Sequence, residues 1–197
     1  MRALPRSFYK RNNVVELSNE LLGKFLFTKE NGTVTGGMII ETEAYAGETD
    51  RACHAYGGKR TKRTEPMFHE GGKSYVYLCY GIHHLFNIVT NKEGIPDAVL
   101  IRAIYPVEGV NTIVKRRNKK AFYENITNGP GTVTQALNIR TDTHNSLSLK
   151  KKNDLWIADD NIQVSSNDIK KDKRVGIGYA GEDANLPYRF ILNNLKF

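Results

Sequence analysis

The chain has 197 residues, 40% of them hydrophobic and 10% aromatic, and this composition excludes an intrinsically disordered protein. It carries 29 Lys and Arg against 21 Asp and Glu, which gives a formal net charge of +8 and a pI of about 9.4. Such an excess of positive charge favours a polyanionic partner, although it says nothing about the fold. From the length we expect residues 1–197 to form a single domain.

The sequence has no features of a membrane or secreted protein. No stretch reaches the roughly 18 apolar residues of a membrane helix, and residues 1–6 are not followed by a signal-peptide core. The two cysteines, Cys53 and Cys79, are too few for a disulfide framework. We therefore expect a cytoplasmic protein in a reducing compartment, with no membrane partner.

The first predicted element is an amphipathic helix. Asn13 and Glu16 have the spacing of a helix N-terminal capping box. Apolar side chains then recur on one helical face, so we expect a helix over residues 14–22.

A β-hairpin is predicted next. The pair Asn31-Gly32 is typical of a tight turn, and it separates strand-like segments at 25–27 and 33–43. Within the second strand, Gly36-Gly37 indicates a bulge or the close approach of another backbone.

A long loop and a second hairpin follow. Residues 46–74 have no regular periodicity, apart from a helical turn expected around 50–55, and long loops inside compact domains are usually functional. Strands at 75–80 and 85–90 flank residues 81–84, which predicts a tight hairpin with bulky groups at its tip.

The second half of the chain completes the expected sheet. We expect a buried strand at 97–104 and a helix that starts at Pro106 and ends among the cations of 115–120. The other expected elements are a short helix at 134–139 after a break at 128–131, strands at 155–157, 175–181 and 188–192, and solvated turns at the basic runs 150–152 and 170–174. Strands in hairpins with irregularly placed helices indicate a single α+β domain.

Two carboxylates are the first candidate functional groups. Glu41, Glu43 and Tyr45 alternate along one strand and therefore share a face. An isolated Glu-x-Glu is ordinarily a pair of surface charges. A carboxylate beside an aromatic ring, however, is placed to activate water next to a bound flat ligand, so we favour Glu43 as a general base and Glu41 as its support.

Aromatic rings are the second group. Tyr75 and Tyr77 share a strand face, and core packing accounts for Tyr75. Tyr80 falls near the hairpin tip, where there is no core to fill, and it has the position of a wedge for a base stack. His54 is suited to stack on a ligand or to hydrogen-bond to it. The alternatives are a structural histidine and a metal ligand, but the His and Cys spacings match no zinc pattern and we expect no metal.

The third group is a cationic, glycine-rich loop. Lys59, Arg60 and Thr61 lie within it, and Arg102 lies on the strand predicted at 97–104. Such a loop can be a solvated turn, but beside an aromatic cluster we expect it to contact phosphates. The glycines at 176 and 178 lack the strand-to-helix context of a dinucleotide site.

Together these motifs resemble the alkyladenine (3-methyladenine) DNA glycosylase family, in register from about residue 21 to about residue 190. The matching segments are Glu41-Thr42-Glu43-Ala44-Tyr45, Ala52-Cys53-His54, Tyr75-Val76-Tyr77 with Tyr80-Gly81, Asn87, Leu100-Ile101-Arg102-Ala103, Gly129-Pro130-Gly131, and Arg174-Val175-Gly176 with Ala180-Gly181. The chain departs from the family pattern at the predicted hairpin tip, which carries His83-His84, and at Thr132-Val133, where bacterial relatives commonly have Lys-Leu.

The resemblance implies a single compact domain with a curved, mostly antiparallel sheet, surrounding helices and a protruding β-hairpin that intercalates into DNA. It also implies a role for each matching position. These roles are water activation by Glu43, help from Arg102 in placing the water, enclosure of a flipped base by Tyr45, His54 and Tyr77, exclusion of normal guanine by Asn87, a water contact from the Val175 carbonyl, and insertion of Tyr80 into the stack.

The implied activity is base-excision repair of alkylated and deaminated purines by hydrolysis of the N-glycosidic bond. The resemblance implies no cofactor, no lyase step, and double-stranded DNA as the partner of a monomer that is associated with the nucleoid through DNA binding. Two alternatives remain: a non-catalytic nucleic-acid-binding module, and a metal-dependent nuclease that uses Glu41, Glu43 and His54.

Overall fold

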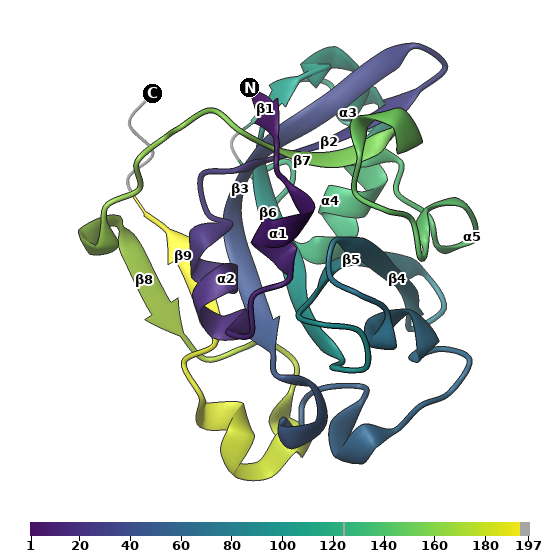
Figure 1. Ribbon diagram of the computed structural model, residues 1–197. Helices are drawn as coiled ribbons and strands as arrows, with labels where there is room; N and C mark the ends of the chain where they lie inside the picture. The colour runs from purple at the N-terminus through teal and green to yellow at the C-terminus, as the bar shows by residue number, and fades with distance from the viewer. Residues whose placement is uncertain (124, 194–197) are drawn as a thin grey trace.

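Antiparallel strands build one sheet through the centre of the protein (Figure 1). The structure, a computed structural model, describes residues 1–123 and 125–193. Within these residues the strand order is β1-β7-β2-β3-β6-β5-β4, and β9 joins β3 and carries β8. The strands are β1 (Arg2–Ala3), β2 (Phe25–Glu30), β3 (Thr33–Tyr45), β4 (Lys73–Cys79), β5 (His83–Thr90), β6 (Asp97–Glu108), β7 (Leu155–Asp159), β8 (Ile169–Asp172) and β9 (Arg189–Leu192).

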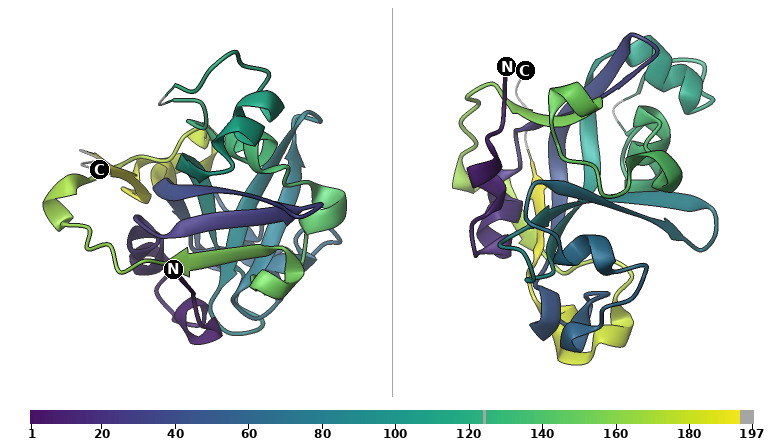
Figure 2. Two further views of the ribbon diagram at one scale, coloured as in Figure 1. Left: turned by 90° about the horizontal axis from the view of Figure 1, so that it is seen from above. Right: turned by 45° about the vertical axis from the view of Figure 1, so that its right-hand side comes forward.

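The helices are short and lie around this curled sheet (Figure 2). They are α1 (Arg6–Tyr9), α2 (Val14–Glu20), α3 (Val110–Arg116), α4 (Pro130–Leu137) and α5 (Thr141–His144), with 3-10 turns at Gly47–Thr49, Tyr56–Gly58, Glu65–Phe68, Lys151–Asn153, Ser166–Asp168 and Gly178–Asn185. In the described residues, no helix is long and apolar enough to cross a bilayer. The predicted α+β class with a curved antiparallel sheet is confirmed.

A single large core joins helices α2 and α4 to the sheet. One buried cluster contains Leu17 from α2, Leu21 at the C-cap of α2, Val133 from α4, and Phe86 and Ile101 from the strands. A fully buried side chain of this kind contributes roughly 1.5–3 kcal/mol relative to exposure. This core fixes β3, β4, β5 and β6, the four strands that carry predicted site residues.

The local signals at the N-terminal end of the chain are confirmed. The Asn13 side chain accepts a 3.0 Å hydrogen bond from the Glu16 N–H at the start of α2. Asn31 and Gly32 adopt positive φ angles of 48° and 81° in the β2–β3 turn, as a tight hairpin requires.

The Gly36-Gly37 pair shows both features that its sequence indicates. The β3–β6 register shifts between the two glycines. A Cβ on Gly37 would lie 2.5 Å from the carbonyl oxygen of Tyr105, and one on Gly36 would lie 2.7 Å from that of Leu26. The two neighbouring strands therefore approach closely enough to require glycine.

The second hairpin turns earlier than the sequence suggests. Cys79 pairs with His83, so the turn consists of residues 80–82, and His83 and His84 begin strand β5. The prediction that His83-His84 form the tip is wrong, because both residues are part of the β4–β5 ladder, where His84 pairs with Leu78 and His83 with Cys79. The tip instead presents Tyr80 and Ile82, which are 92% and 71% exposed.

Four boundaries in the second half of the chain also differ from expectation. Pro106 lies in β6, opposite the β3 irregularity at Gly37, and the helix begins only at Val110. Helix α4 starts at Pro130 rather than at residue 134. Residues 170–172 pair as strand β8 rather than form a turn, whereas 175–181 form loop and 3-10 turns instead of a strand.

Candidate active site

A β-bulge directs the side chain of Arg102 at two carboxylates. The consecutive β3 residues Glu41 and Thr42 pair with residues 103 and 101 of β6, which leaves Arg102 as an extra residue. Bulges re-aim a side chain in this way beside functional sites. Arg102 Nε lies 2.7 Å from Glu41 Oε1, and Nη1 lies 3.3 Å from Glu43 Oε1.

Glu43 is completely buried, and each of its carboxylate oxygens accepts a hydrogen bond. Its Oε1 accepts from the Val175 backbone N–H at 2.8 Å, and its Oε2 accepts from the Tyr45 hydroxyl at 2.8 Å. Burial raises the pKa of the Glu43 carboxyl above its usual value, and Glu41 adds to this, although Arg102 and the two hydrogen bonds oppose the rise. A carboxylate whose pKa is moved toward neutrality is suited to take a proton from water.

Glu41 supports this arrangement from the same strand face, as the alternation predicts. Its Oε1 accepts hydrogen bonds of 2.7 Å from the Nε atoms of both Arg102 and Arg189. The carboxylate of Glu41 therefore fixes the guanidinium that contacts Glu43.

A cavity of about 530 Å³ opens beside Glu43. Eight of the predicted site residues line it, namely Glu43, Tyr45, His54, Tyr77, Tyr80, Asn87, Arg102 and Val175. They come from β3, β4, β5, β6, the β4–β5 turn and two loops, so only the folded chain brings them together.

His54 is held neutral at the wall of the cavity. Its Nδ1 lies 2.9 Å from the Tyr75 hydroxyl, and its Nε2 lies 3.4 Å from Arg63 Nη2. A guanidinium only donates, so Nε2 accepts and the ring proton is on Nδ1. Burial, with help from Arg63 and Lys59, lowers the pKa of His54 to about 4. Its ring meets the Tyr77 ring edge-on at 4.7 Å.

Asn87 and Tyr80 both line the cavity but differ in their exposure to solvent. Asn87 is buried, and its side-chain amide donates 3.1 Å to the Tyr75 carbonyl. Tyr80 is on the exposed hairpin turn with a positive φ of 50°, a backbone conformation that bulky residues rarely adopt. The neighbouring carbonyl therefore fixes the Asn87 amide, whereas the Tyr80 ring faces solvent.

The cationic loop reaches the cavity through Arg63, whereas Lys59, Arg60 and Thr61, for which the prediction is contact with phosphates, lie outside its lining. Arg60 is held in a bidentate pair with Glu65 at 2.7 and 2.8 Å, and Thr61 bonds within the loop. Neither they nor Lys59 lines the cavity, and Arg63 does, with its guanidinium 4.9 Å from the Tyr77 ring centre. The run of basic residues did not distinguish Arg63 from its neighbours.

Three more contributors escaped the sequence reasoning. Asp50 and Arg174 form a buried ion pair behind the cavity wall, although Arg174 falls in a run predicted to be a solvated turn. Tyr179 lines the cavity rim and donates 3.2 Å to the Ala52 carbonyl. The sequence shows the repeated tyrosines and the isolated Asp50. It does not show that Asp50 pairs with Arg174 or that Tyr179 contacts Ala52, each across more than a hundred residues.

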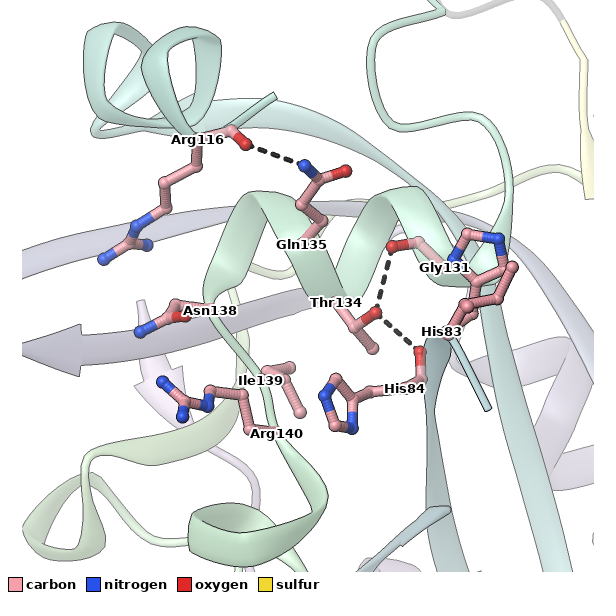
Figure 3. A pocket seen from close by; sticks show the side chains of 10 residues that line it. His83, His84, Arg116, Gly131, Thr134, Gln135, Asn138, Ile139 and Arg140 are labelled. Carbon is pink, nitrogen blue, oxygen red and sulfur yellow. Dashed lines mark hydrogen bonds between the residues drawn. The ribbon is translucent and has the colours of Figure 1, made fainter. Parts of the chain in front are cut away.

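A second cavity, of about 610 Å³, lies on the other side of the hairpin, against α4 (Figure 3). There Thr134 donates 2.6 Å to the His84 carbonyl, and Gln135 donates 3.0 Å to the Arg116 carbonyl. None of the predicted catalytic or base-binding residues lines it. The first of these bonds attaches α4 to β5, and the second attaches α4 to α3.

Comparison with known proteins agrees with this geometry. The model of the methylpurine-DNA glycosylase (MPG) family matches residues 7–196. A protein of Chlamydia felis named "Putative 3-methyladenine DNA glycosylase" is 46% identical over 196 residues, covering 98% of this chain and 97% of its own. A protein of Clostridium novyi with the same name is 40% identical over 208 residues, covering 100% and 98%. The chain therefore belongs to the methylpurine-DNA glycosylase family.

Proposed function

We propose that this protein removes alkylated purines from double-stranded DNA by hydrolysing the N-glycosidic bond with a water that Glu43 activates. The observation that carries the proposal is the position of Glu43, a buried carboxylate that accepts a hydrogen bond at each oxygen and lies at the wall of an aromatic cavity. The cavity volume of about 530 Å³ is ample for a purine.

The substrate base reaches this cavity by leaving the duplex. Extrusion costs a few kcal/mol, and least for a damaged base. Stacking on Tyr45, Tyr77 and His54, which line the cavity, returns roughly 1–3 kcal/mol per aromatic contact. The exposed Tyr80 ring on the hairpin turn fills the vacated place in the stack. The free-energy cost of extrusion and the gain from stacking are of similar size, so eversion of a damaged base is reversible and selective.

Bond cleavage places positive charge on the sugar. The bonding electrons leave with the base, the water oxygen bonds to the sugar carbon, and the water proton passes to Glu43. The Glu43 carboxylate also stabilises the cationic sugar electrostatically. Arg102, held between Glu41 and Glu43, keeps the carboxylate ionised and oriented.

The substrate class follows from the charge of the lesion. N3- and N7-methylated purines carry a positive charge, which weakens their glycosidic bond and attracts electron-rich rings. His54 is neutral because its pKa is lowered to about 4, so this ring adds no repulsive charge. Asn87 at the cavity floor crowds the amino group of an unmodified guanine.

The reaction stops at the abasic site. A lyase step requires a lysine amine that attacks the sugar to form a Schiff base. In the described part of the chain, no lysine lines the cavity. We therefore expect no covalent adduct when the protein is mixed with damaged DNA and borohydride, and a trapped adduct would contradict the monofunctional mechanism.

One assay tests the proposal. Duplexes that carry 3-methyladenine, 7-methylguanine or hypoxanthine are incubated with the protein, with and without EDTA, and scored for free base and then for alkali-labile strands. We expect base release that EDTA does not affect. Glu43→Gln should lower the rate by about 10²–10⁴-fold with DNA binding retained, whereas the exposed Glu93→Gln should not change it.

Two other outcomes identify the rival functions. If Glu43→Gln binds the duplexes as well as the wild type does, and neither protein releases base, the protein is a non-catalytic binding module. If the strands are cleaved without prior release of base, and EDTA abolishes this cleavage, the protein is a metal-dependent nuclease.

A further inference from the structure

A buried ion pair lies directly behind the wall of the active site. Arg174 and Asp50 have side chains that are 0% and 1% exposed, and Arg174 immediately precedes Val175, whose N–H holds Glu43. Neither residue lines the cavity, so neither touches a bound base.

The Arg174 guanidinium connects three segments of the chain. It donates to both Asp50 carboxylate oxygens, to the Ala44 carbonyl at 2.8 Å and to the Asp183 carbonyl at 3.2 Å. Its Nε alone is buried without an acceptor. Ala44 lies between Glu43 and Tyr45 on β3, so Arg174 attaches the loop of Val175 to the catalytic strand itself.

The Asp50 carboxylate shapes the loop that carries His54. Besides Arg174, its oxygens accept from the Ala46 N–H at 3.1 Å and the Ala52 N–H at 3.0 Å. These bonds set the turn that leads from the end of β3 toward His54.

The same guanidinium packs on the ring that donates to Glu43. Its central carbon lies 4.9 Å from the centre of the Tyr45 ring and 5.3 Å from that of Tyr188. Tyr45 is therefore fixed by the cation at its ring and by Glu43 at its hydroxyl. Two of the contacts that orient Glu43, the Tyr45 O–H and the Val175 N–H, thus depend on Arg174.

We propose that Asp50 and Arg174 are positioning residues that hold the Tyr45 hydroxyl and the Val175 amide on the Glu43 carboxylate. This inference rests on the proposed glycosylase function. A buried ion pair contributes little net stability compared with an apolar replacement. Its measurable effect is accordingly expected in the rate of base release and in the pH dependence of that rate.

The test uses Arg174→Lys, which keeps the charge but cannot reproduce the forked donors. Single-turnover base release is measured with saturating protein, well below the melting temperature of each variant. Loss of a hydrogen bond to an ionised group predicts a rate roughly 10- to 100-fold lower. Affinity for abasic DNA should remain within about threefold of the wild type, because no DNA contact is removed.

The pH profile separates positioning from mere structural support. Glu43 faces Glu41 and Tyr45 on β3, Arg102 on β6 and the Val175 N–H. Weakening the two hydrogen bonds removes interactions that favour the carboxylate, so the acid limb of the rate should move to higher pH in Arg174→Lys. A purely structural role would leave this limb in place.

Two further variants keep the result decisive. Asp50→Asn combined with Arg174→Gln removes both charges, leaves no uncompensated buried ion, and should reproduce the slow rate if the single variant does not fold. Arg116→Lys is the matched control, because Arg116 also bonds a carboxylate and a backbone carbonyl, those of Glu30 and Ala136, outside the cavity. It should release base at the wild-type rate.

A folded Arg174→Lys or double variant with the wild-type rate and pH profile would overturn the inference. Absence of base release by the wild type would instead overturn the proposed function. The two failures are therefore distinguishable in the same experiment.

Discussion

The backbone N–H of Val175 donates a 2.8 Å hydrogen bond to Oε1 of Glu43, across 132 residues of sequence. A carboxylate on β3 is thus oriented by a loop from the C-terminal part of the chain. Backbone donors cannot rotate away as side chains can, so this bond fixes which lone pairs of Glu43 remain for a water. The contact links the completion of folding to the formation of a competent site.

The first prediction concerns the pH dependence of base release. Only ionised Glu43 accepts a proton, and burial raises its pKa above the usual 4.5. The single-turnover rate should therefore fall as the pH drops, with a midpoint above about 4.5. In Arg102→Gln the midpoint should move further up, because the cation that most strongly favours the carboxylate is gone. A midpoint that moves down in this variant would contradict the prediction.

The second prediction concerns the hairpin turn. Tyr80 is 92% exposed, so Tyr80→Ala should leave the melting temperature unchanged. Loss of one stacking ring should weaken binding to damaged duplex by roughly 1–3 kcal/mol, or about 5- to 150-fold. Fluorescence anisotropy on an abasic duplex measures this. Ile82→Ala, at another exposed position of the same turn, should have a smaller effect, and equal losses would contradict a stacking role.

The third prediction concerns His54. Its folded pKa is about 4, lowered by burial and then by Arg63 and Lys59, whereas the unfolded value is about 6.5. The unfolded chain therefore binds the additional proton first, and this group makes stability fall as the pH drops from about 6.5 toward 4. NMR of the His54 ring, assigned with His54→Gln, should show a midpoint near 4. A midpoint near 6.5 would contradict the neutral ring inferred above.

Much of the fold was predictable because its signals are local. The Asn13 cap and the Asn31-Gly32 turn are read from two to four adjacent residues, and both form as expected. The prediction of a helix that starts at Pro106 was wrong, because the tertiary environment of this residue overrides its local preference. It sits opposite the irregular pairing at Gly37, where a strand tolerates a residue without an N–H.

The site was predictable where one strand carries it. Glu41, Glu43 and Tyr45 share a face as the alternation predicts: Arg102 contacts both carboxylates, and the Tyr45 hydroxyl donates to Glu43. The structure of residues 170–181 could not be predicted from a pattern of this kind. The burial of Arg174 depends on Asp50, 124 residues earlier, and no composition rule distinguishes such a cation from the solvated lysines beside it.

The fourth prediction tests the close approach of strands at Gly37. An added Cβ would lie 2.5 Å from the Tyr105 carbonyl oxygen and 2.9 Å from its carbon, and both are backbone atoms that cannot turn aside. Gly37→Ala should therefore cost about 1–3 kcal/mol, as overpacking typically does. For a chain of this size that lowers the melting temperature by roughly 2–4 °C per kcal/mol.

Gly178→Ala is the matched control for this substitution. Within residues 1–123 and 125–193, no atom lies within 4 Å of a Cβ added there. Because Gly178 has no positive φ, an alanine fits its backbone without strain. Differential scanning calorimetry should show a lower melting temperature for Gly37→Ala and no decrease for Gly178→Ala. If Gly37→Ala has the same melting temperature as the wild type, β3 and β6 are free to separate locally. The bulged pairing that directs Arg102 is then less rigid than its geometry indicates.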